Sequence, residues 1–203
     1  MGEAILPFPD KKYQIIYADP PWRYRDKRKN PKTDRPRKYG GIGYPTMAVE
    51  EICELPVKNI SDDNCILFIW VTFPILEEVF KVIKAWGFEY KTLGFSWIKI
   101  NKNDGKPFFG IGHYTKSNCE VCLIGLKGKV KPISDQISSV IISKRGIHSE
   151  KPHIIREKIV KLCGDLPRIE LFFRYNIPGW DCWGDEKDLI VRPENKKAIN
   201  PFF

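Results

Sequence analysis

The chain has 203 residues, of which 42% are hydrophobic, and a formal net charge of +9. This length predicts one well-buried domain over residues 1–203 rather than two, and the basic excess favours a polyanionic partner. No apolar run is long enough to cross a bilayer, and the first residues lack a basic segment followed by an apolar one. We therefore expect no membrane association and a cytoplasmic location.

Six cysteines are scattered along the chain, mostly in apolar runs, as reduced thiols in a core would be. Cys119 and Cys122 form a CxxC pair. No second pair and no histidine partner completes a tetrahedral set, so the sequence predicts no metal site.

The first predicted element is a buried strand over Tyr13–Ala18, which follows a short leader at residues 1–12. β-branched and aromatic residues dominate this run, and Pro20 and Pro21 end it abruptly. Asp19 therefore lies at the carboxyl end of a strand, which is where ligands bind in an open α/β sheet.

The tetrapeptide Asp19–Pro20–Pro21–Trp22 suits a planar heterocycle that carries an amino group. Prolines fix φ and supply no amide hydrogen, so we expect outward-pointing carbonyls without a competing donor. If Asp19 and the Pro20 carbonyl each accept one N–H of an exocyclic amine, its lone pair is freed for attack. Trp22 or a neighbouring aromatic residue can clamp the ring. The alternative is an ordinary acidic turn after a strand.

A strongly basic segment at residues 23–43 follows this corner. We expect a mobile loop that grips phosphates with a salt-sensitive affinity, although a solvated loop in a basic protein is the alternative. The basic residues assigned to substrate are Arg25, Lys27, Arg28 and Lys29.

A short helix is predicted from about Met47 to Glu54, with Thr46 as its N-cap. Tyr44 precedes this helix and either closes over the heterocycle as a second stacking wall or packs within its own loop.

Strand and helix patterns then alternate, which predicts a three-layer α/β domain with a mostly parallel sheet. Residues 101–118 interrupt this pattern with glycines and paired aromatic residues, and they predict a movable lid over the substrate. The predicted strands are Cys65–Val71, Phe88–Ile100, Cys119–Lys127, Ser139–Ser143 and Arg168–Phe173, and the helices run from Pro74 to Gly87 and from Pro152 to Gly164.

The sequence contains no G-x-G-x-x-G motif and no P-loop, so neither a dinucleotide nor a nucleoside triphosphate is indicated. Lys151 before a helix can take an α-carboxylate with help from the helix amides. Arg174 follows the last strand, and carboxylates in the tail can take ribose hydroxyls. Ordinary surface pairing of Lys151 and Arg174 is the equal alternative.

Six motifs in order resemble the adenine-N(6) methyltransferases related to the 70 kDa subunit of mRNA adenosine methyltransferase. They are Ala18–Trp22, Tyr44–Met47, Leu67–Thr72, Glu120–Gly125, His148–Pro152 and Ile169–Arg174. The resemblance runs from about residue 13 to 186. It implies a Rossmann-like fold with S-adenosylmethionine as methyl donor and the motif order of β-class DNA amino-methyltransferases.

The resemblance also implies roles for individual residues. Asp19 and Pro20 orient the amine in a catalytic corner completed by Pro21 and Trp22. The residues implied to border the adenine are Tyr44 and Glu120; those implied to contact the donor are Asp19, Lys151, Arg174, Asn176, Asp185 and Glu186. The chain departs from the family pattern where Asp185 and Glu186 replace amides, His153 replaces an acid and Phe173 replaces a glycine.

The resemblance implies direct methyl transfer to the 6-amino group of adenine, with no covalent enzyme intermediate and no metal. A chain of this size resembles prokaryotic or phage members, so DNA is favoured over RNA, and a duplex would have to extrude its adenine. Residues 23–43 and 101–118 would supply sequence recognition, and residues 187–203 form a tail.

Several alternatives stay open. The chain could methylate RNA, or act as a catalytically silent nucleic-acid-binding subunit of a methyltransferase complex. Whichever reading holds, a homodimer or a heterodimer is possible. Methylation of a cytosine or glutamine amine is a further alternative, although enzymes of that kind usually carry serine or asparagine in place of the leading aspartate.

Overall fold

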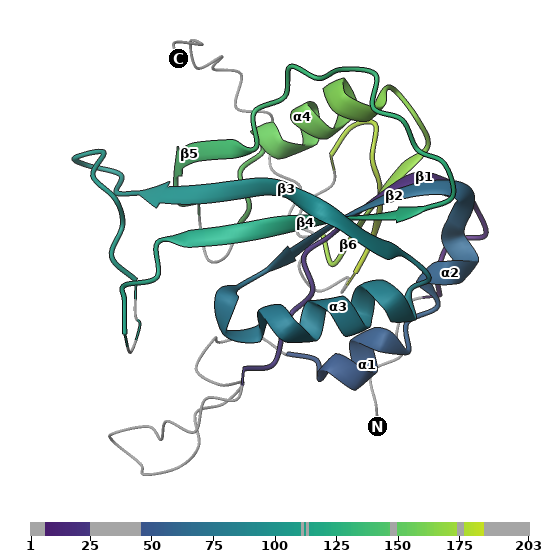
Figure 1. Ribbon diagram of the computed structural model, residues 1–203, viewed down its shortest axis with the longest axis horizontal. Helices are drawn as coiled ribbons and strands as arrows, with labels where there is room; N and C mark the ends of the chain where they lie inside the picture. The colour runs from purple at the N-terminus through teal and green to yellow at the C-terminus, as the bar shows by residue number, and fades with distance from the viewer. Residues whose placement is uncertain are drawn as a thin grey trace.

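The computed structural model describes residues 7–24, 46–110, 112, 114–146, 150–173 and 177–184. These residues form a seven-stranded sheet in the order β5-β3-β4-β2-β1-β6-β7 (Figure 1). The strands are β1 Tyr13–Ala18, β2 Ser61–Val71, β3 Glu89–Ile100, β4 Cys119–Lys127, β5 Val140–Lys144, β6 Arg168–Leu171 and β7 Asp181–Trp183.

The sheet is mostly parallel. β1 runs parallel to β2 and β6, β3 runs parallel to β5, and β6 runs parallel to β7, whereas β4 is antiparallel to both of its neighbours. The mixed α/β class and the mostly parallel sheet predicted from the sequence are thereby confirmed.

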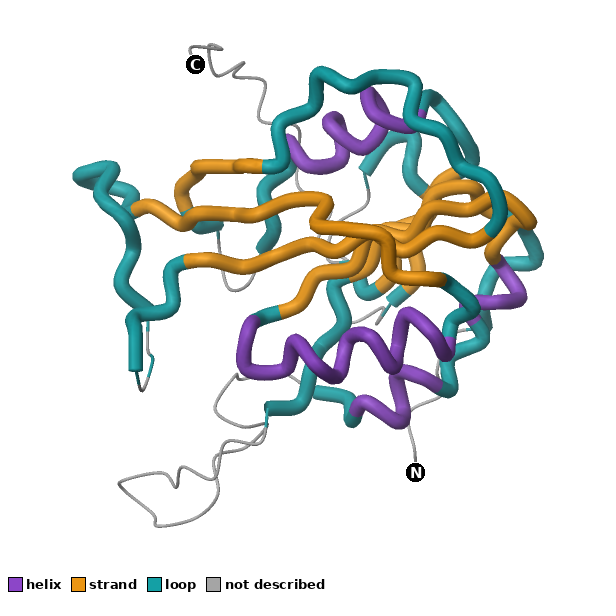
Figure 2. The backbone as a smooth tube through the Cα atoms, in the orientation of Figure 1, coloured by secondary structure: helices purple, strands orange, loops and turns teal. Residues whose placement is uncertain are grey.

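Helices cover both faces of this sheet, as Figures 1 and 2 show. α1 (Val49–Cys53) and α3 (Leu76–Ala85) lie on one face, and α4 (Ile154–Cys163) lies on the other. The chain also forms the short helix α2 (Val57–Ile60) and the 3-10 turn η2 (Phe73–Ile75). None of the helices within the described ranges has the length and apolar character needed to cross a membrane.

The central strands carry continuous apolar runs, Cys65–Val71 in β2 and Ile15–Ala18 in β1, because each face of the sheet meets a separate core. Ile16 and Leu67 pack with α1 and α3 residues, whereas their sequence neighbours Tyr17 and Phe68 pack with α4 residues. Full burial of one such large side chain contributes about 1.5–3 kcal/mol. The two cores thus pack against both faces of β1 and β2, whose carboxyl ends carry the candidate site.

The structure corrects several details of the predicted elements. The first helix begins at Val49, and Ala48 occupies its N-cap position, with the Glu51 carboxylate accepting a hydrogen bond from the Ala48 amide. Thr46 is therefore not the N-cap. The predicted lid stays a prediction; among its described residues the Phe108 amide donates to the Lys99 carbonyl and the Gly110 amide to the Ser117 carbonyl.

Two apolar helix residues are partly exposed. Phe80 is 40% exposed, and its ring meets the Tyr90 ring edge-on at 5.1 Å between centroids. Ile154 at the start of α4 is also 40% exposed.

Candidate active site

The carboxyl ends of β1 and β6 define the candidate site. Ala18 pairs with Ile69 of β2 on one side and with Leu171 of β6 on the other, so Asp19 leaves the sheet level with both neighbours. The chain proceeds from β1 to β2 in one direction across the sheet and from β6 to β7 in the other. A point where strand order reverses in this way opens a crevice beyond the strand ends, where ligands bind.

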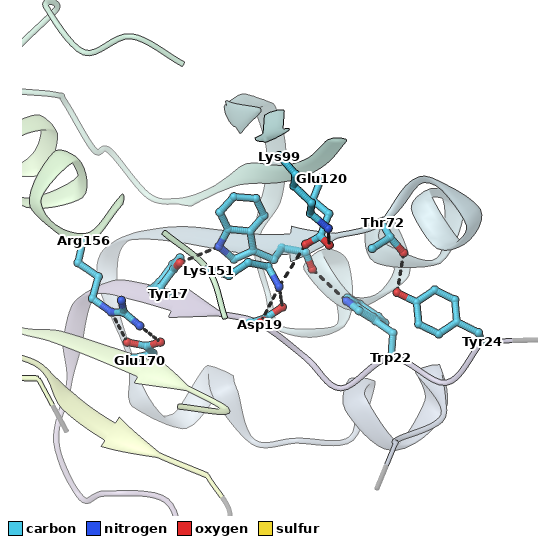
Figure 3. A network of polar contacts seen from close by, with 11 residues as sticks. Tyr17, Asp19, Trp22, Tyr24, Thr72, Lys99, Glu120, Lys151, Arg156 and Glu170 are labelled. Atoms are coloured by element: carbon cyan, nitrogen blue, oxygen red, sulfur yellow. Dashed lines mark hydrogen bonds and ion pairs between the residues drawn. The ribbon is translucent and has the colours of Figure 1, made fainter. Parts of the chain in front are cut away.

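The corner after β1 is fastened to the fold through Trp22 and Tyr24. The Trp22 indole N–H donates to the Trp70 carbonyl at 2.9 Å, and the ring is only 5% exposed, within the core. The Tyr24 hydroxyl lies 2.8 Å from Thr72 Oγ1 (Figure 3). Trp22 therefore holds the corner in place, and its buried ring is not available to stack on a ligand.

The proline carbonyls are not the row of unopposed acceptors expected from the sequence. The Trp22 amide donates to the Pro20 carbonyl at 2.8 Å, and the Met47 amide donates to the Pro21 carbonyl at 2.8 Å. That expectation is wrong because the Trp22 amide turns back onto Pro20, and Met47, which pairs with Trp22, supplies the donor to Pro21. Each carbonyl oxygen has a second lone pair for a further donor.

Lys151 holds the Asp19 carboxylate. Its Nζ lies 2.7 Å from both Asp19 oxygens and 3.3 Å from Glu120 Oε2 (Figure 3). Burial alone would lower the pKa of Lys151, but the charges of Asp19 and Glu120 outweigh it and raise that pKa above its usual value. The ammonium group thus stays charged at neutral pH.

Glu120 lies at the start of β4 and has a second cation, Lys99 on β3, within contact of its carboxylate. Burial alone would raise the pKa of Glu120, but Lys151 and Lys99 lower it below its ordinary value. The sequence reasoning missed Lys99. Its signal was weak, because a lysine near the end of an alternating strand is common, and the antiparallel register of Trp97 with Glu120 is not readable from one strand.

A cavity of about 840 Å³ opens beside this charged cluster. Glu120 and Lys99 form part of its lining, so it reaches the residues that contact Lys151 and, through it, Asp19. Its other walls come from the end of β3, the residues after it, and the segment after β5. The corner is therefore neighboured by a hollow of the size that ligand sites have, about 300–1,000 Å³.

The end of β6 is strained and closely packed. Phe172 has φ of 62°, a left-handed conformation that side chains other than glycine rarely adopt. Its amide donates to the Trp183 carbonyl at 2.7 Å. A side chain at Gly184 would meet the Phe173 amide nitrogen at 3.2 Å, so a larger residue there would require the ends of β6 and β7 to shift slightly apart. These ends immediately precede Arg174 and Asp185 in the sequence.

Most of the other predicted contacts lie outside the described residues. They are Arg25, Lys27, Arg28, Lys29, Tyr44, Arg174, Asn176, Asp185 and Glu186. The structure thus brings together Asp19, Lys151 and Glu120, with Pro20 and Trp22 in the corner beside them. His153, where the family pattern has an acid, lies 2.9 Å from Glu150 Oε1.

The protein is an α/β protein with a mostly parallel sheet. Its candidate ligand site lies at the carboxyl edge of the sheet, where Lys151 binds the Asp19 carboxylate at the switch point. Residues 13–186 match the family model named MT-A70. The chain belongs to the MT-A70 family.

Individual relatives differ in how much of their length they share with this chain. A protein named Type II methyltransferase M.MunI, from Mycoplasma sp, is 37% identical over 98% of this chain and 86% of its own length. An N(6)-adenosine-methyltransferase MT-A70-like protein from Drosophila melanogaster is 31% identical over 90% of this chain. The human N(6)-adenosine-methyltransferase catalytic subunit METTL3 is 28% identical over 88% of it. The chain spans only 28% and 29% of the length of these two eukaryotic relatives.

Proposed function

We propose that this protein transfers a methyl group from S-adenosylmethionine to the exocyclic 6-amino group of adenine in DNA. The observation that carries the proposal is the Asp19 carboxylate, which lies at the switch point, is held by Lys151 and remains 22% exposed. Membership of the MT-A70 family and the similarity to a type II methyltransferase support the same reaction.

Asp19 and Pro20 act on the amine in this proposal. The lone pair of an adenine 6-amino nitrogen is delocalised into the ring, which makes the group a poor nucleophile. Asp19 accepts one of its N–H groups, and the free lone pair of the Pro20 carbonyl accepts the other. These hydrogen bonds favour the tetrahedral nitrogen that forms as the new N–C bond develops, so they act mainly in the transition state.

Lys151 and Glu120 prepare the carboxylate. Lys151 donates to both Asp19 oxygens, and its Nζ also lies 3.3 Å from Glu120 Oε2, so the ammonium has a second acceptor when the amine engages Asp19. Trp22 positions the corner through its bond to the Trp70 carbonyl. Tyr44 is proposed as a stacking wall for the adenine.

The residues at the ends of β6 and β7 fit a methyl donor. S-adenosylmethionine, when bound, supplies a methyl group activated on a sulfonium. Gly184 leaves little room for a side chain beside Phe173, and a glycine at a strand end lets a ligand approach the backbone closely. We propose that Lys151, Arg174, Asn176, Asp185 and Glu186 hold the donor, in a sheet whose strand order is Rossmann-like.

DNA is proposed over RNA because the relative that shares nearly its whole length with this chain is a type II methyltransferase, whereas the RNA-type relatives are far longer. The net charge of +9 supports a nucleic-acid partner in either case. We further propose that residues 1–203 form one domain, and that the six free thiols reflect a reducing cytoplasm.

A labelled-methyl assay tests the proposal. Matched DNA and RNA oligonucleotides, each single and double stranded, are incubated with the protein and the labelled donor, and nucleosides are then identified by mass spectrometry. The proposal expects N6-methyladenine in DNA. Label confined to RNA would establish the RNA alternative, and label on cytosine would overturn the assignment of the base.

The basic residues after the corner have a separate test. Replacing Arg25, Lys27, Arg28 and Lys29 together by alanine should weaken DNA binding and flatten the slope of log affinity against log salt, since each lost phosphate contact lowers that slope by about 0.7–0.9. An unaltered slope would remove these residues from the phosphate contacts.

A catalytically silent nucleic-acid-binding subunit is the second candidate function. The intact Asp19 corner with its buried lysine favours activity instead. Calorimetry with S-adenosylmethionine separates the two, because the enzyme should bind the donor and a silent subunit should not.

A further inference from the structure

The 840 Å³ cavity lies beside the corner that the proposed reaction uses: Glu120 lines it, whereas Asp19, Pro20 and Trp22 do not. One wall is a hairpin at the end of β3, in which the Asn101 amide donates to the Lys106 carbonyl at 2.9 Å and the Phe108 amide donates to the Lys99 carbonyl at 2.8 Å. The facing wall is the segment after β5, with Arg145 and Gly146. Glu120 lies at the end of the cavity nearest Asp19.

The chemistry of the lining changes from one end to the other. At the Glu120 end the charges are paired, because Lys99 and Lys151 both contact that carboxylate. Away from it, the lining residues are Asn101, Lys102, Asn103, Asp104, Arg145 and Glu150. The two acids among them have partners of their own, because Asp104 accepts from the Lys106 amide and Glu150 contacts His153. The amides together with Lys102 and Arg145 suit a ligand that brings its own negative charge and hydrogen-bonding edges.

Arg145 is held in a defined plane by Phe108. The centre of its guanidinium lies 3.6 Å from the centroid of the Phe108 ring. Within the described residues, no carboxylate forms an ion pair with Arg145, and its side chain is exposed. Stacking on an aromatic ring fixes the guanidinium plane and leaves its N–H edge for a phosphate, which it can bind through two parallel hydrogen bonds.

The size of the cavity is in the upper part of the range for small-molecule sites, about 300–1,000 Å³. Asp19 is not among the lining residues, so the cavity is space beside the target amine and not the place of the amine itself. Its natural occupant is the part of the polynucleotide that is covalently attached to the target adenine.

We propose that this end of the cavity is a subsite for the nucleotide next to the target adenine, with its phosphate on Arg145 and its base edge against Asn101 and Asn103. The inference rests on the proposed function and extends it to sequence preference. A side-chain amide carries both a hydrogen-bond donor and an acceptor, so it can distinguish the edge of one base from that of another. The subsite makes the base beside the adenine a determinant of where the enzyme acts.

Binding variants test the phosphate contact directly. Fluorescence anisotropy measures the affinity of a labelled single-stranded DNA oligonucleotide with one adenine, over a series of salt concentrations. R145A should bind about tenfold more weakly and lose about 0.7 from the salt slope. R145K should keep the slope yet still bind more weakly, because a lysine lacks the planar fork. K131A removes an exposed charge that does not line the cavity and should match the wild type.

The matched change F108L leaves the arginine in place and removes the ring beneath it. It should lower affinity about threefold without altering the salt slope, because the stack orders the contact and carries no charge itself. If R145A and K131A bind alike, the phosphate contact is refuted.

A second experiment tests the base contact. The rate of methyl transfer is measured on oligonucleotides that carry every base on either side of the adenine. The double variant N101A/N103A should flatten the preference at one of the two positions, whereas N59A, an exposed amide on α2, should leave it unchanged. An unchanged preference in N101A/N103A would refute the subsite.

The two levels of inference fail in different ways. Absence of methyl transfer to any nucleic acid, with oligonucleotide binding still dependent on Arg145, would overturn the proposed function and leave the phosphate contact standing. Normal transfer to adenine, with R145A and N101A/N103A equal to their controls, would overturn the subsite and leave the proposed function standing.

Discussion

Two ion pairs link the region of α4 to the neighbouring strands β6 and β1, and they differ in geometry and exposure. Arg156 of α4 binds Glu170 of β6 through two hydrogen bonds of 2.6 Å, and the two side chains are 12% and 7% exposed. Lys151, just before α4, binds the two Asp19 oxygens through a single ammonium, and Asp19 is 22% exposed.

The difference separates a structural pair from an exchangeable one. The planar guanidinium of Arg156 donates to both Glu170 oxygens, so each oxygen already has a hydrogen-bond partner within the pair. The ammonium of Lys151 is a compact charge with a second carboxylate, Glu120, 3.3 Å away. A carboxylate at a strand end, held by a cation that has an alternative partner, is suited to binding a substrate in a way that a closed pair is not.

The largest effect is expected at Asp19. Asp19→Ala should lower methyl transfer by more than about a thousandfold, which corresponds to about 4 kcal/mol, because the amine loses its charged acceptor. Steady-state kinetics on an adenine-containing oligonucleotide measures the loss, and calorimetry should find donor binding largely retained. Wild-type turnover in Asp19→Ala would refute the role of the carboxylate.

The Arg156–Glu170 pair should respond in stability instead. Glu170→Gln leaves the Arg156 guanidinium buried without its charge partner and should destabilise the fold by about 3–5 kcal/mol in urea unfolding. The activity of the folded fraction should persist. Lys11→Ala breaks an exposed pair with Asp181 and serves as the control, with a cost of about 1 kcal/mol or less.

The double variant R156M/E170L sharpens that test. It removes both charges and should recover most of the stability lost in Glu170→Gln, because no unpaired charge remains in the core. A double variant no more stable than Glu170→Gln would show that shape, and not charge pairing, dominates at this position.

Removal of the Lys151 charge should have an intermediate effect. Lys151→Met takes charge-assisted bonds from Asp19 and leaves two carboxylates close together, so kcat/KM should fall about ten- to hundredfold, in line with 1.5–3 kcal/mol per such bond. Lys151→Arg keeps the charge and should lose less. Equal activity of Lys151→Met and wild type would mean that Asp19 needs no cation.

The smallest effect is a pH dependence at Glu120. Its pKa is lowered in the folded protein, so its ionisation contributes stability above the unfolded value of about 4.3 and loses it as the pH falls through the folded pKa. The stability difference between wild type and Glu120→Gln should therefore be constant from about pH 8 to pH 5 and shrink in stronger acid. Urea midpoints over this range provide the measurement, and a difference independent of pH would contradict the account.

The regular elements were largely readable from the sequence because their patterns are local. The apolar run Cys65–Val71 predicted a strand covered on both faces, and the prolines after Ala18 predicted where the first strand ends. The structure confirms both strands. α2 was missed because four residues are too few to show a helical period. β7 was missed because its three residues lie in a tail without alternation.

The site was only half readable, because its contacts are distant along the chain. The sequence placed Asp19 at a strand end, but the contact of Lys151 with Asp19 joins residues 132 positions apart, and no spacing rule predicts it. The Lys99 contact depends on the register of β3 against β4. The donor to the Pro21 carbonyl, the Met47 amide, likewise comes from a segment that local reasoning treats separately.

The most direct measurement of the central claim is a crystal structure of the protein with an adenine-containing DNA oligonucleotide and S-adenosylhomocysteine. The account predicts the 6-amino nitrogen of the target adenine within hydrogen-bond distance, about 2.7–3.2 Å, of both an Asp19 oxygen and the Pro20 carbonyl. An adenine whose amino group points away from Asp19, or binds elsewhere on the protein, would contradict it.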